Sequence, residues 1–230
     1  MKIGIIAAME EELNSLLEAL TSKTESSVLG NTYYSGRFGK HELVLVQSGI
    51  GKVMSAMTVA ILVENFNVQA IINTGSAGAV ASDLSIGDIV VADKLVYHDV
   101  DLTAFDYDFG QMAQQPLFFE SDQEFVETFQ AVLEEADNHS KIGLIATGDS
   151  FIAGQDKIDL IVSHFPEVLA VEMEGAAIAQ AAHTSGVPFI VVRAMSDTAA
   201  HDANITFDQF IIEAGKQSAF TLLAFLNKLN

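Results

Sequence analysis

The sequence of 230 residues contains no cysteine. This absence excludes disulfide bonds, a thiolate nucleophile, and zinc or iron–sulfur sites that cysteine would hold. The chain also lacks a long apolar run, because the run over 3–9 is followed at once by Glu10, Glu11 and Glu12. A run this short cannot span a bilayer, and the acids that follow it argue against a signal peptide. We therefore expect a cytoplasmic protein without a membrane partner.

Basic residues are scarce. Lysine and arginine total 11 against 31 aspartates and glutamates, so the formal net charge is −20. Such a surface favours solubility and repels phosphate backbones, and we expect no nucleic-acid partner. Only two arginines are present, Arg37 and Arg193. Enzymes that clamp a free phosphate usually use several arginines, because the guanidinium group matches the geometry of phosphate.

The order of the sequence patterns predicts one α/β domain over 1–230. Half of the residues are hydrophobic, and no repeat, linker or change in composition divides the chain. A hairpin is expected to turn at Gly39 and Lys40, and the later alternation of strands with helices predicts a mostly parallel sheet. The patterns indicate strands over 2–8, 32–38, 42–47, 69–73, 88–97, 141–146, 168–170 and 188–192, and helices over 9–20, 53–66, 122–136, 156–165, 176–182 and 204–226.

Two carboxylates stand where a strand is expected to end and a helix to begin. The apolar strand over 168–170 leads to Glu172 and Glu174, and the helix over 176–182 follows. In open α/β folds, ligands bind at this edge of the sheet. If the strand continues through Glu174, both side chains leave the same face of the sheet. The stretch therefore predicts part of a binding site.

Three other segments place unusual residues at strand ends. The strand over 188–192 leads into Arg193 and Asp197, which form either a site edge or an ion pair in a loop. The small residues over 74–79 let the backbone approach a ligand, although turns also use such residues. Glu12 follows the first strand, whereas the helix dipole is enough to explain Glu10 and Glu11. A doubly wound sheet would bring these ends together.

Several features argue against other kinds of site. His98, Asp99 and Asp101 have no second histidine at ligand spacing, so we predict no metal. The segment 48–52 lacks the spacing of a nucleoside triphosphate loop and is predicted to be a tight turn with N–H groups facing the sheet edge. Phe151 fits either the core or stacking on a flat ligand. Paired carboxylates without a metal or cofactor suggest hydrolysis of a glycosidic bond by an acid and a base.

Six segments together resemble the nucleoside phosphorylase and nucleosidase superfamily, and more narrowly the bacterial 5′-methylthioadenosine/S-adenosylhomocysteine nucleosidases. The resemblance implies a three-layer α/β/α single domain with a central mixed, mostly parallel twisted sheet. It also implies hydrolysis of methylthioadenosine and S-adenosylhomocysteine, with 5′-deoxyadenosine as a further substrate, in methionine salvage. The segments occur in the family's order over nearly the whole chain: 3–12, 73–78, 98–101, 147–152, 171–176 and 193–197.

The resemblance implies a role for each member of the predicted acid–base group. Asp197 would protonate N7 of adenine while the C–N bond breaks. Glu12 would orient and deprotonate the attacking water near C1′, and Arg193 would orient Glu12 and keep it ionised. Glu174 would grip the ribose hydroxyls, and its negative charge becomes more favourable as the sugar gains oxocarbenium character.

The resemblance further implies the walls of the pocket. Phe151 would stack on adenine while the Ile152 backbone hydrogen-bonds to its edge, and Glu172 would support the site or contact the sugar. The remaining substrate-binding residues would be Ser76, Ala77, Gly78 and Ser196 around the base and ribose, and Met9, Ile50, Met173 and Phe207 in the apolar wall. No cofactor is implied.

The resemblance also implies a homodimer, in which Leu102 and Phe105 close the 5′ end of the neighbouring subunit's pocket. One alternative is a phosphorylase of the same superfamily, which the small number of arginines disfavours. A second alternative is a non-catalytic adenosine-binding protein. The presence of both Glu12 and Asp197 disfavours that alternative.

Overall fold

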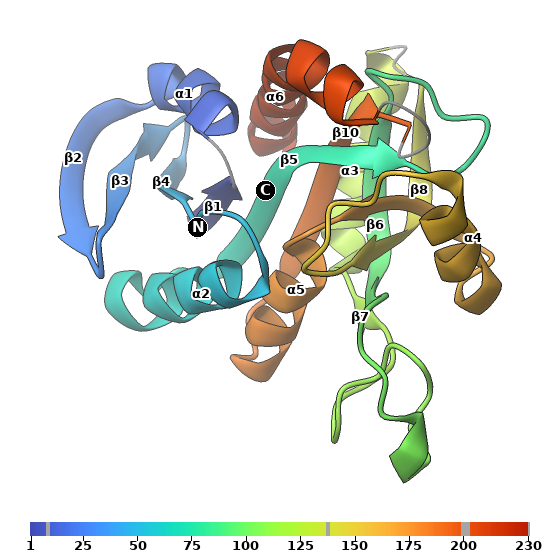
Figure 1. Cartoon of the computed structure of the whole chain (residues 1–230). Coiled ribbons are helices and arrows are strands. Elements are labelled where there is room, and N and C mark those ends of the chain that lie inside the picture. The colour runs from blue at the N-terminus through green and yellow to red at the C-terminus, as the bar shows by residue number, and fades with distance from the viewer. Residues whose placement is uncertain (8–9, 137–138, 199–202, 230) are drawn as a thin grey trace.

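The computed structural model describes residues 1–7, 10–136, 139–198 and 203–229 (Figure 1). Within these ranges the side chains of residues 11, 12, 203–209 and 214 are not described. None of the helices in these ranges combines the length and the apolar character that crossing a membrane requires.

The N-terminal part of the sheet combines a parallel pair with a hairpin. β1 (Lys2–Ala7) pairs in parallel with β4 (His41–Gln47), which forms the predicted hairpin with β3 (Asn31–Phe38). Gly39 turns the hairpin with a φ of 55°, a conformation that glycine adopts without strain. β2 (Thr21–Val28) was not predicted from the sequence. Its residues are almost all polar and exposed, so it has no apolar alternation to indicate a strand.

The remaining large strands close into a ring. β5 (Ala70–Ala79) pairs with β9 (Val168–Glu172), β9 with β8 (Ser140–Thr147), β8 with β6 (Ile89–Tyr97), β6 with β10 (Phe189–Asp197), and β10 again with β5. β1 joins the N-terminal strands to this ring through β5, and the short β7 (Phe119–Glu120) pairs with β6. The ring brings the ends of strands that are distant in sequence around one space.

The expected mixed sheet is confirmed, and more of its paired residues lie in parallel than in antiparallel pairs. Among the described strands, the pairs β1–β4, β1–β5, β5–β10, β6–β8 and β8–β9 are parallel. The pairs β2–β3, β3–β4, β5–β9, β6–β7 and β6–β10 are antiparallel. Two of the antiparallel pairs, β5–β9 and β6–β10, belong to the ring, which therefore contributes to the mixed character of the sheet.

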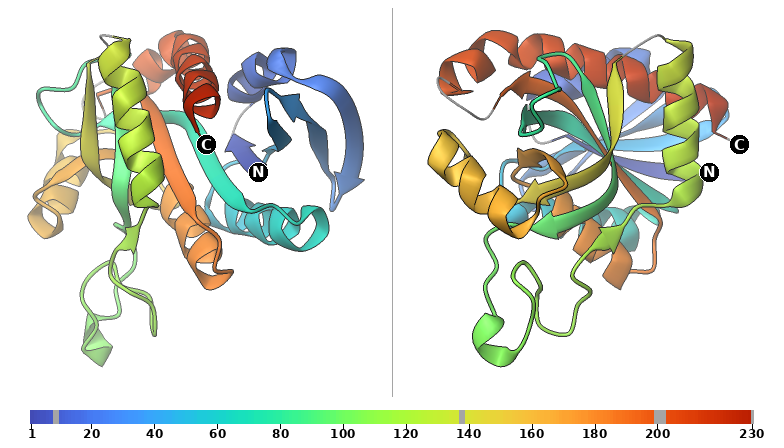
Figure 2. Two further views of the ribbon diagram at one scale, coloured as in Figure 1. Left: turned by 180° about the vertical axis from the view of Figure 1, so that it is seen from behind. Right: turned by 90° about the vertical axis from the view of Figure 1, so that its right-hand side faces the viewer.

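Helices cover both faces of the sheet, as Figures 1 and 2 show. α2 (Lys52–Phe66) and α5 (Gly175–Thr184) pack on one face, where Ile6 and Leu62 share a buried cluster. α1 (Glu10–Ala19), α3 (Gln123–Glu135) and α6 (Ala203–Lys228) pack on the other, where Ile5 and Leu16 share a second cluster. α4 (Gln155–His164) packs beside β8 and β9. The alternation of side chains along β1 therefore supplies both layers.

Two segments that were predicted as loops belong to strands. β5 continues through the small residues up to Ala79, and β10 continues through Arg193 up to Asp197. The two segments pair with each other, with Arg193 opposite Gly75 and Asp197 opposite Gly78. Pairing in the sheet thus overrides the low strand propensity of glycine, alanine and serine. The other predicted helices and strands are confirmed, with ends within two residues of the prediction.

Candidate active site

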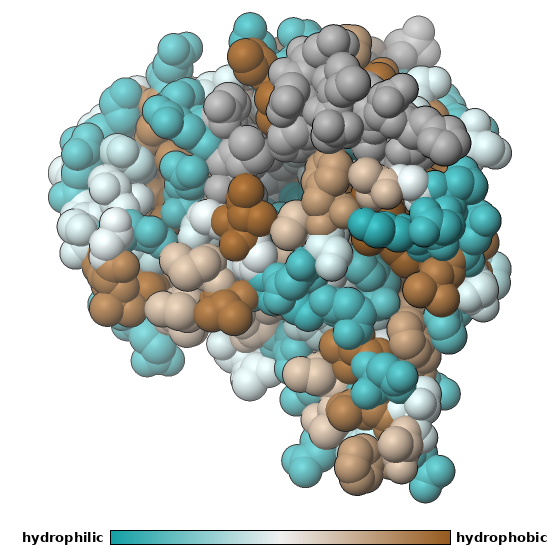
Figure 3. Space-filling model, viewed as in Figure 1, coloured by the Kyte–Doolittle hydropathy of each residue, from teal (hydrophilic) through white to brown (hydrophobic). Residues whose placement is uncertain are grey.

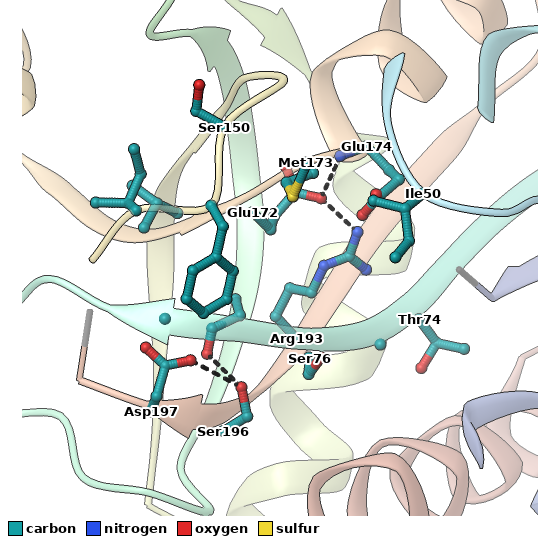
Figure 4. A pocket seen from close by; sticks show the side chains of 16 residues that line it. Ile50, Thr74, Ser76, Ser150, Glu172, Met173, Glu174, Arg193, Ser196 and Asp197 are labelled. Atoms are coloured by element: carbon teal, nitrogen blue, oxygen red, sulfur yellow. Dashed lines mark hydrogen bonds and ion pairs between the residues drawn. The ribbon is translucent and has the colours of Figure 1, made fainter. Parts of the chain in front are cut away.

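A cavity of about 300 Å³ lies where the C-terminal halves of β5, β9 and β10 meet the segment after β8 (Figure 4). Because the ring closes, residues from four distant parts of the chain share this space. The cavity also reaches the turn before α2. Its lining is Ile50, Thr74, Gly75, Ser76, Ala77, Gly78, Ser150, Phe151, Ile152, Val171, Glu172, Met173, Glu174, Arg193, Ser196 and Asp197.

A buried ion pair crosses the floor of the cavity. Arg193 Nη2 lies 2.6 Å from Glu172 Oε2, and both side chains are 2% exposed. The same carboxylate oxygen accepts the backbone N–H groups of Gly175 at 2.7 Å and Glu174 at 3.1 Å. The hydroxyl of Thr147 donates to the other oxygen. Glu172 therefore holds the start of α5 and the guanidinium group of Arg193 together.

Gly175 makes this arrangement possible. A Cβ atom at this position would lie 3.1 Å from Glu172 Oε1 and 2.6 Å from a methyl group of Leu95. The absence of a side chain lets the start of α5 approach the carboxylate closely enough for both N–H groups to donate to it.

Arg193 pairs with a carboxylate that was not predicted as its partner, Glu172. The prediction that it orients Glu12 concerns a side chain outside the described residues, so that pairing stays a prediction. In the described structure its guanidinium group donates to Glu172, to the side chain of Asn73 and, at 3.2 Å, to the Val192 carbonyl. Its Nε has no hydrogen-bond partner among the described residues.

Glu174 does not share a sheet face with Glu172. β9 ends at Glu172, and Glu174 has φ −132° and ψ −38° at the position before α5. The condition for two carboxylates on one sheet face is therefore not met, because the chain leaves the strand between them. The Gly51 N–H donates to Glu174 Oε1 at 2.8 Å. The turn before α2 thus points an N–H group at the site, as the sequence indicated.

Asp197 ends β10 on another side of the cavity (Figure 4). Asp197 is only 2% exposed. The Ser196 hydroxyl lies 3.1 Å from Asp197 Oδ2 and 3.4 Å from the Ala77 carbonyl oxygen. The cavity consequently has buried carboxylates at two separate places, Glu174 and Asp197, together with a charge-paired arginine. Among the described residues no group of three acidic or histidine side chains could hold a metal ion.

Comparison with known proteins identifies the family. A family model described as the phosphorylase superfamily matches residues 2–227. A relative from Staphylococcus haemolyticus, named 5′-methylthioadenosine/S-adenosylhomocysteine nucleosidase, is 49% identical over 94% of this chain and 95% of its own. The chain belongs to the phosphorylase superfamily, among its 5′-methylthioadenosine/S-adenosylhomocysteine nucleosidases. The family resemblance seen in the sequence is confirmed.

Two solved nucleosidase structures share the whole fold. S-adenosylhomocysteine nucleosidase from Streptococcus pyogenes, in complex with 5-methylthiotubericidin, is 73% identical with a TM-score of 0.99, covering 100% of this chain and 98% of the other. The 5′-methylthioadenosine/S-adenosylhomocysteine nucleosidase from S. pneumoniae, with the transition-state inhibitor MT-ImmA, is 66% identical with a TM-score of 0.98 and full coverage of both chains. The single-domain α/β architecture is thus the nucleosidase fold.

The predicted apolar wall is only partly described. Ile50 and Phe151 line the cavity but are 56% and 42% exposed, so this wall faces solvent on one side. Met173 and the buried Ile152 complete the described part. Met9 lies outside the described residues, and so does the side chain of Phe207.

Leu102 and Phe105 do not line the cavity of their own chain. Leu102 precedes the short 3₁₀ helix η1 (Thr103–Phe105), and Phe105 is its last residue. Both belong to the segment 98–118, which projects from the body of the molecule (Figure 1). Phe105 is 73% exposed. Their predicted place in a partner's pocket stays a prediction.

Several supporting residues were missed in the sequence. Thr147 ends β8, and Asn73 follows the apolar start of β5. Each binds a member of the ion pair on the cavity floor. Thr74, Gly75, Ser150 and Val171 line the cavity beside predicted residues. A buried polar residue after a Val/Ile-rich strand is the signal that would have indicated Asn73 and Thr147.

Proposed function

We propose that this protein hydrolyses the N-glycosidic bond of 5′-methylthioadenosine and S-adenosylhomocysteine, releasing adenine and the 5′-substituted ribose. The observation that carries the proposal is the position of Glu174 and Asp197 as separate buried carboxylates on one cavity, in a chain of this family. The solved relatives with 5-methylthiotubericidin and MT-ImmA support a nucleoside as the ligand. 5′-Deoxyadenosine is a further substrate in this proposal, and cytoplasmic methionine salvage is its setting.

Asp197 is the proposed general acid. The C–N bond breaks as its electron pair moves into the adenine ring, and a proton on N7 neutralises the charge that develops there. Asp197 gives this proton, so it must carry one when the nucleoside binds. The Ser196 hydroxyl, 3.1 Å from Asp197 Oδ2, is suited to fix the orientation of the carboxyl group.

Glu174 is the proposed ribose grip. Ribose hydroxyls are hydrogen-bond donors, and a carboxylate accepts from them strongly. The Gly51 N–H holds one oxygen of Glu174 at 2.8 Å, which restricts the rotation of the carboxylate. Because the ribose becomes cationic as the bond breaks, part of this interaction strengthens only in the transition state.

Glu12 is the proposed base for the attacking water. It belongs to the first turns of α1, which begins at Glu10 shortly after β1. The family resemblance supports this role, and the side chain itself lies outside the described residues. Water attack at C1′ transfers the hydroxyl group to the sugar and the second proton to Glu12, which completes the hydrolysis.

Water rather than phosphate is the proposed nucleophile. Of the two arginines, Arg37 lies exposed on β3 and outside the cavity lining, and Arg193 is already paired with Glu172. No arginine of the described site therefore remains to bind a phosphate. The test is adenine release from methylthioadenosine, S-adenosylhomocysteine and 5′-deoxyadenosine with and without phosphate. Equal rates and a free sugar product are expected, whereas ribose 1-phosphate derivatives would contradict the proposal.

A homodimer is part of the proposal, with Leu102 and Phe105 reaching the partner's pocket. Exposed apolar side chains support an interface, including Phe105 on the projecting segment and Val53, Met54 and Met57 on α2. Figure 3 shows apolar surface over both regions. Light scattering should give twice the chain mass of 24.7 kDa. A monomer with full activity would contradict this assignment.

A further inference from the structure

Beside the cavity, a lysine and two aspartates from three segments bind one another. We call Lys52, Asp99 and Asp149 the Lys52 cluster. Lys52 Nζ lies 2.8 and 2.7 Å from the two oxygens of Asp99, and 3.7 Å from Asp149 Oδ2. The Asp149 N–H donates to Asp99 Oδ2 at 2.9 Å. Every member thus contacts both of the others.

The cluster is joined directly to the proposed ribose grip. Two consecutive N–H groups at the start of α2 point to different carboxylates. The Gly51 N–H donates to Glu174 Oε1 at 2.8 Å, and the Lys52 N–H donates to Asp149 Oδ1 at 2.9 Å. The turn before α2 is therefore held between Asp149 on one side and Glu174 on the other.

The local geometry leaves this turn little freedom. Gly51 has a φ of 96°, which other residues rarely adopt, and a Cβ atom there would lie 3.1 Å from Asp149 Oδ1. Asp99 follows β6 by two residues and Asp149 follows β8 by two residues. The cluster thus ties the turn to two strands of the ring, which are rigid supports for a site.

The exposure of the cluster argues against a mainly structural role. The side chains of Lys52 and Asp99 are 23% and 26% exposed, and that of Asp149 is 51% exposed. Ion pairs this accessible to water contribute little to global stability. The same contacts can still fix the position of a hydrogen-bond donor, which matters for a carboxylate that must bind two hydroxyl groups, because a misplacement of about 1 Å can strongly reduce the rate.

We propose that the Lys52 cluster is a positioning device for the ribose grip. Asp99 orients Lys52 and Asp149, these two fix the turn before α2, and the Gly51 N–H then sets the orientation of the Glu174 carboxylate. This inference rests on the proposed hydrolysis, and it assigns to Lys52, Asp99 and Asp149 a role that the acid, base and pocket walls do not require.

The test compares D99N with the wild-type protein on two nucleosides. In the proposal, the 2′- and 3′-hydroxyls of methylthioadenosine bind Glu174. The kcat/KM for this nucleoside should therefore fall about tenfold in D99N, which corresponds to about 1.4 kcal/mol. For its 2′,3′-dideoxy analogue no hydroxyl meets Glu174, and the two proteins should differ less than twofold. K52R, which keeps the charge, should retain more activity than K52Q.

The control variant is E167Q, which removes the Lys94–Glu167 pair at 3.1 Å. These side chains are 30% and 54% exposed and outside the cavity lining, so both kcat/KM values should stay at the wild-type level. Circular dichroism confirms folding, and D149N replaces D99N if the latter does not fold. An equal loss on both nucleosides, or no loss, would overturn the positioning role. Wild-type protein that releases no adenine would instead overturn the proposed hydrolysis.

Discussion

One ion-paired group lies in the cavity and another lies beside it in different surroundings, and each is linked to Glu174 through a backbone N–H group. On the floor, Glu172 and Arg193 are 2% exposed, and Glu172 accepts the Glu174 N–H. At the side, Lys52 and Asp99 are about one-quarter exposed, and the neighbouring Gly51 N–H binds the Glu174 carboxylate. A buried charge without its partner is costly, whereas a charge near water is resolvated. The Glu172–Arg193 pair should therefore contribute to the stability of the fold, whereas the Lys52 cluster should affect only the position of the Glu174 carboxylate.

The largest expected effect lies outside both groups, at the general acid. D197N keeps the shape of the side chain but cannot give a proton to N7, so kcat should fall on the order of 10²–10⁴-fold. Stopped assays of adenine release would measure this change. Stability should stay near the wild-type value, because neither ion pair is altered.

The control for this prediction is S196A, which removes the hydroxyl 3.1 Å from Asp197 Oδ2 and leaves the acid itself. Its loss should be much smaller than that of D197N. If D197N and the wild-type protein release adenine at the same rate, Asp197 is not the general acid and the non-catalytic alternative gains support.

The second largest effect should come from the floor. E172Q removes the charge that pairs with buried Arg193, and the free energy of unfolding should fall by about 3–5 kcal/mol. Denaturant titration followed by circular dichroism would measure it. Replacing both partners, as in E172Q/R193M, should cost less than E172Q alone, since no uncompensated charge then stays buried. A loss below about 1 kcal/mol in E172Q would place this pair in the same class as exposed pairs.

The side group should respond weakly in the same measurement. D99N removes the charge that pairs with Lys52, and the free energy of unfolding should change by less than about 1 kcal/mol. The comparison between E172Q and D99N is matched, because each variant replaces a carboxylate with an amide of the same shape next to one cation. Equal destabilisation by the two variants would show that burial does not distinguish the two groups.

Local sequence patterns revealed much of the fold, but not the parts that depend on distant strands. Apolar periodicity indicated most helices and strands, because each such pattern is local. The polar edge strand β2 gave no such signal, and the extensions of β5 and β10 depend on a partner strand rather than on their own residues. The ring closes through the pairing of β5 with β10, which are far apart in the sequence, so no local pattern could predict it.

The same limit applies to the site. Residue type and position at strand ends indicated Glu172, Glu174, Arg193 and Asp197, which line one cavity. The pairing of Arg193 with Glu172 was not predicted, because their strands are separated by β5 and meet only across the ring. The roles of Glu12, Met9 and Phe207 stay predictions from the family resemblance, since the structure does not describe their side chains.

The smallest expected effect concerns His98, whose pKa depends on charges from both groups. Burial lowers the pKa of His98, whereas the charges of Asp99 and then Glu172 raise it, and Lys52 lowers it. Because its folded pKa lies below the unfolded value of about 6.5, the unfolded chain binds more protons on acidification. The contribution of His98 to stability is therefore fully present above the unfolded pKa of about 6.5, and it is lost progressively as the pH falls from there through the lower folded pKa.

Measuring this pKa by NMR in variants would show which group His98 follows. D99N should lower the pKa of His98 more than E172Q does, because Asp99 is the stronger of the two raising charges. K52Q should raise it slightly, since a positive charge is removed. H98N should weaken the dependence of stability on pH below about 6.5, the reference pKa of histidine. A His98 that responds only to E172Q would mean that the side group is screened by water, and that the influence of the Lys52 cluster ends at its hydrogen bonds.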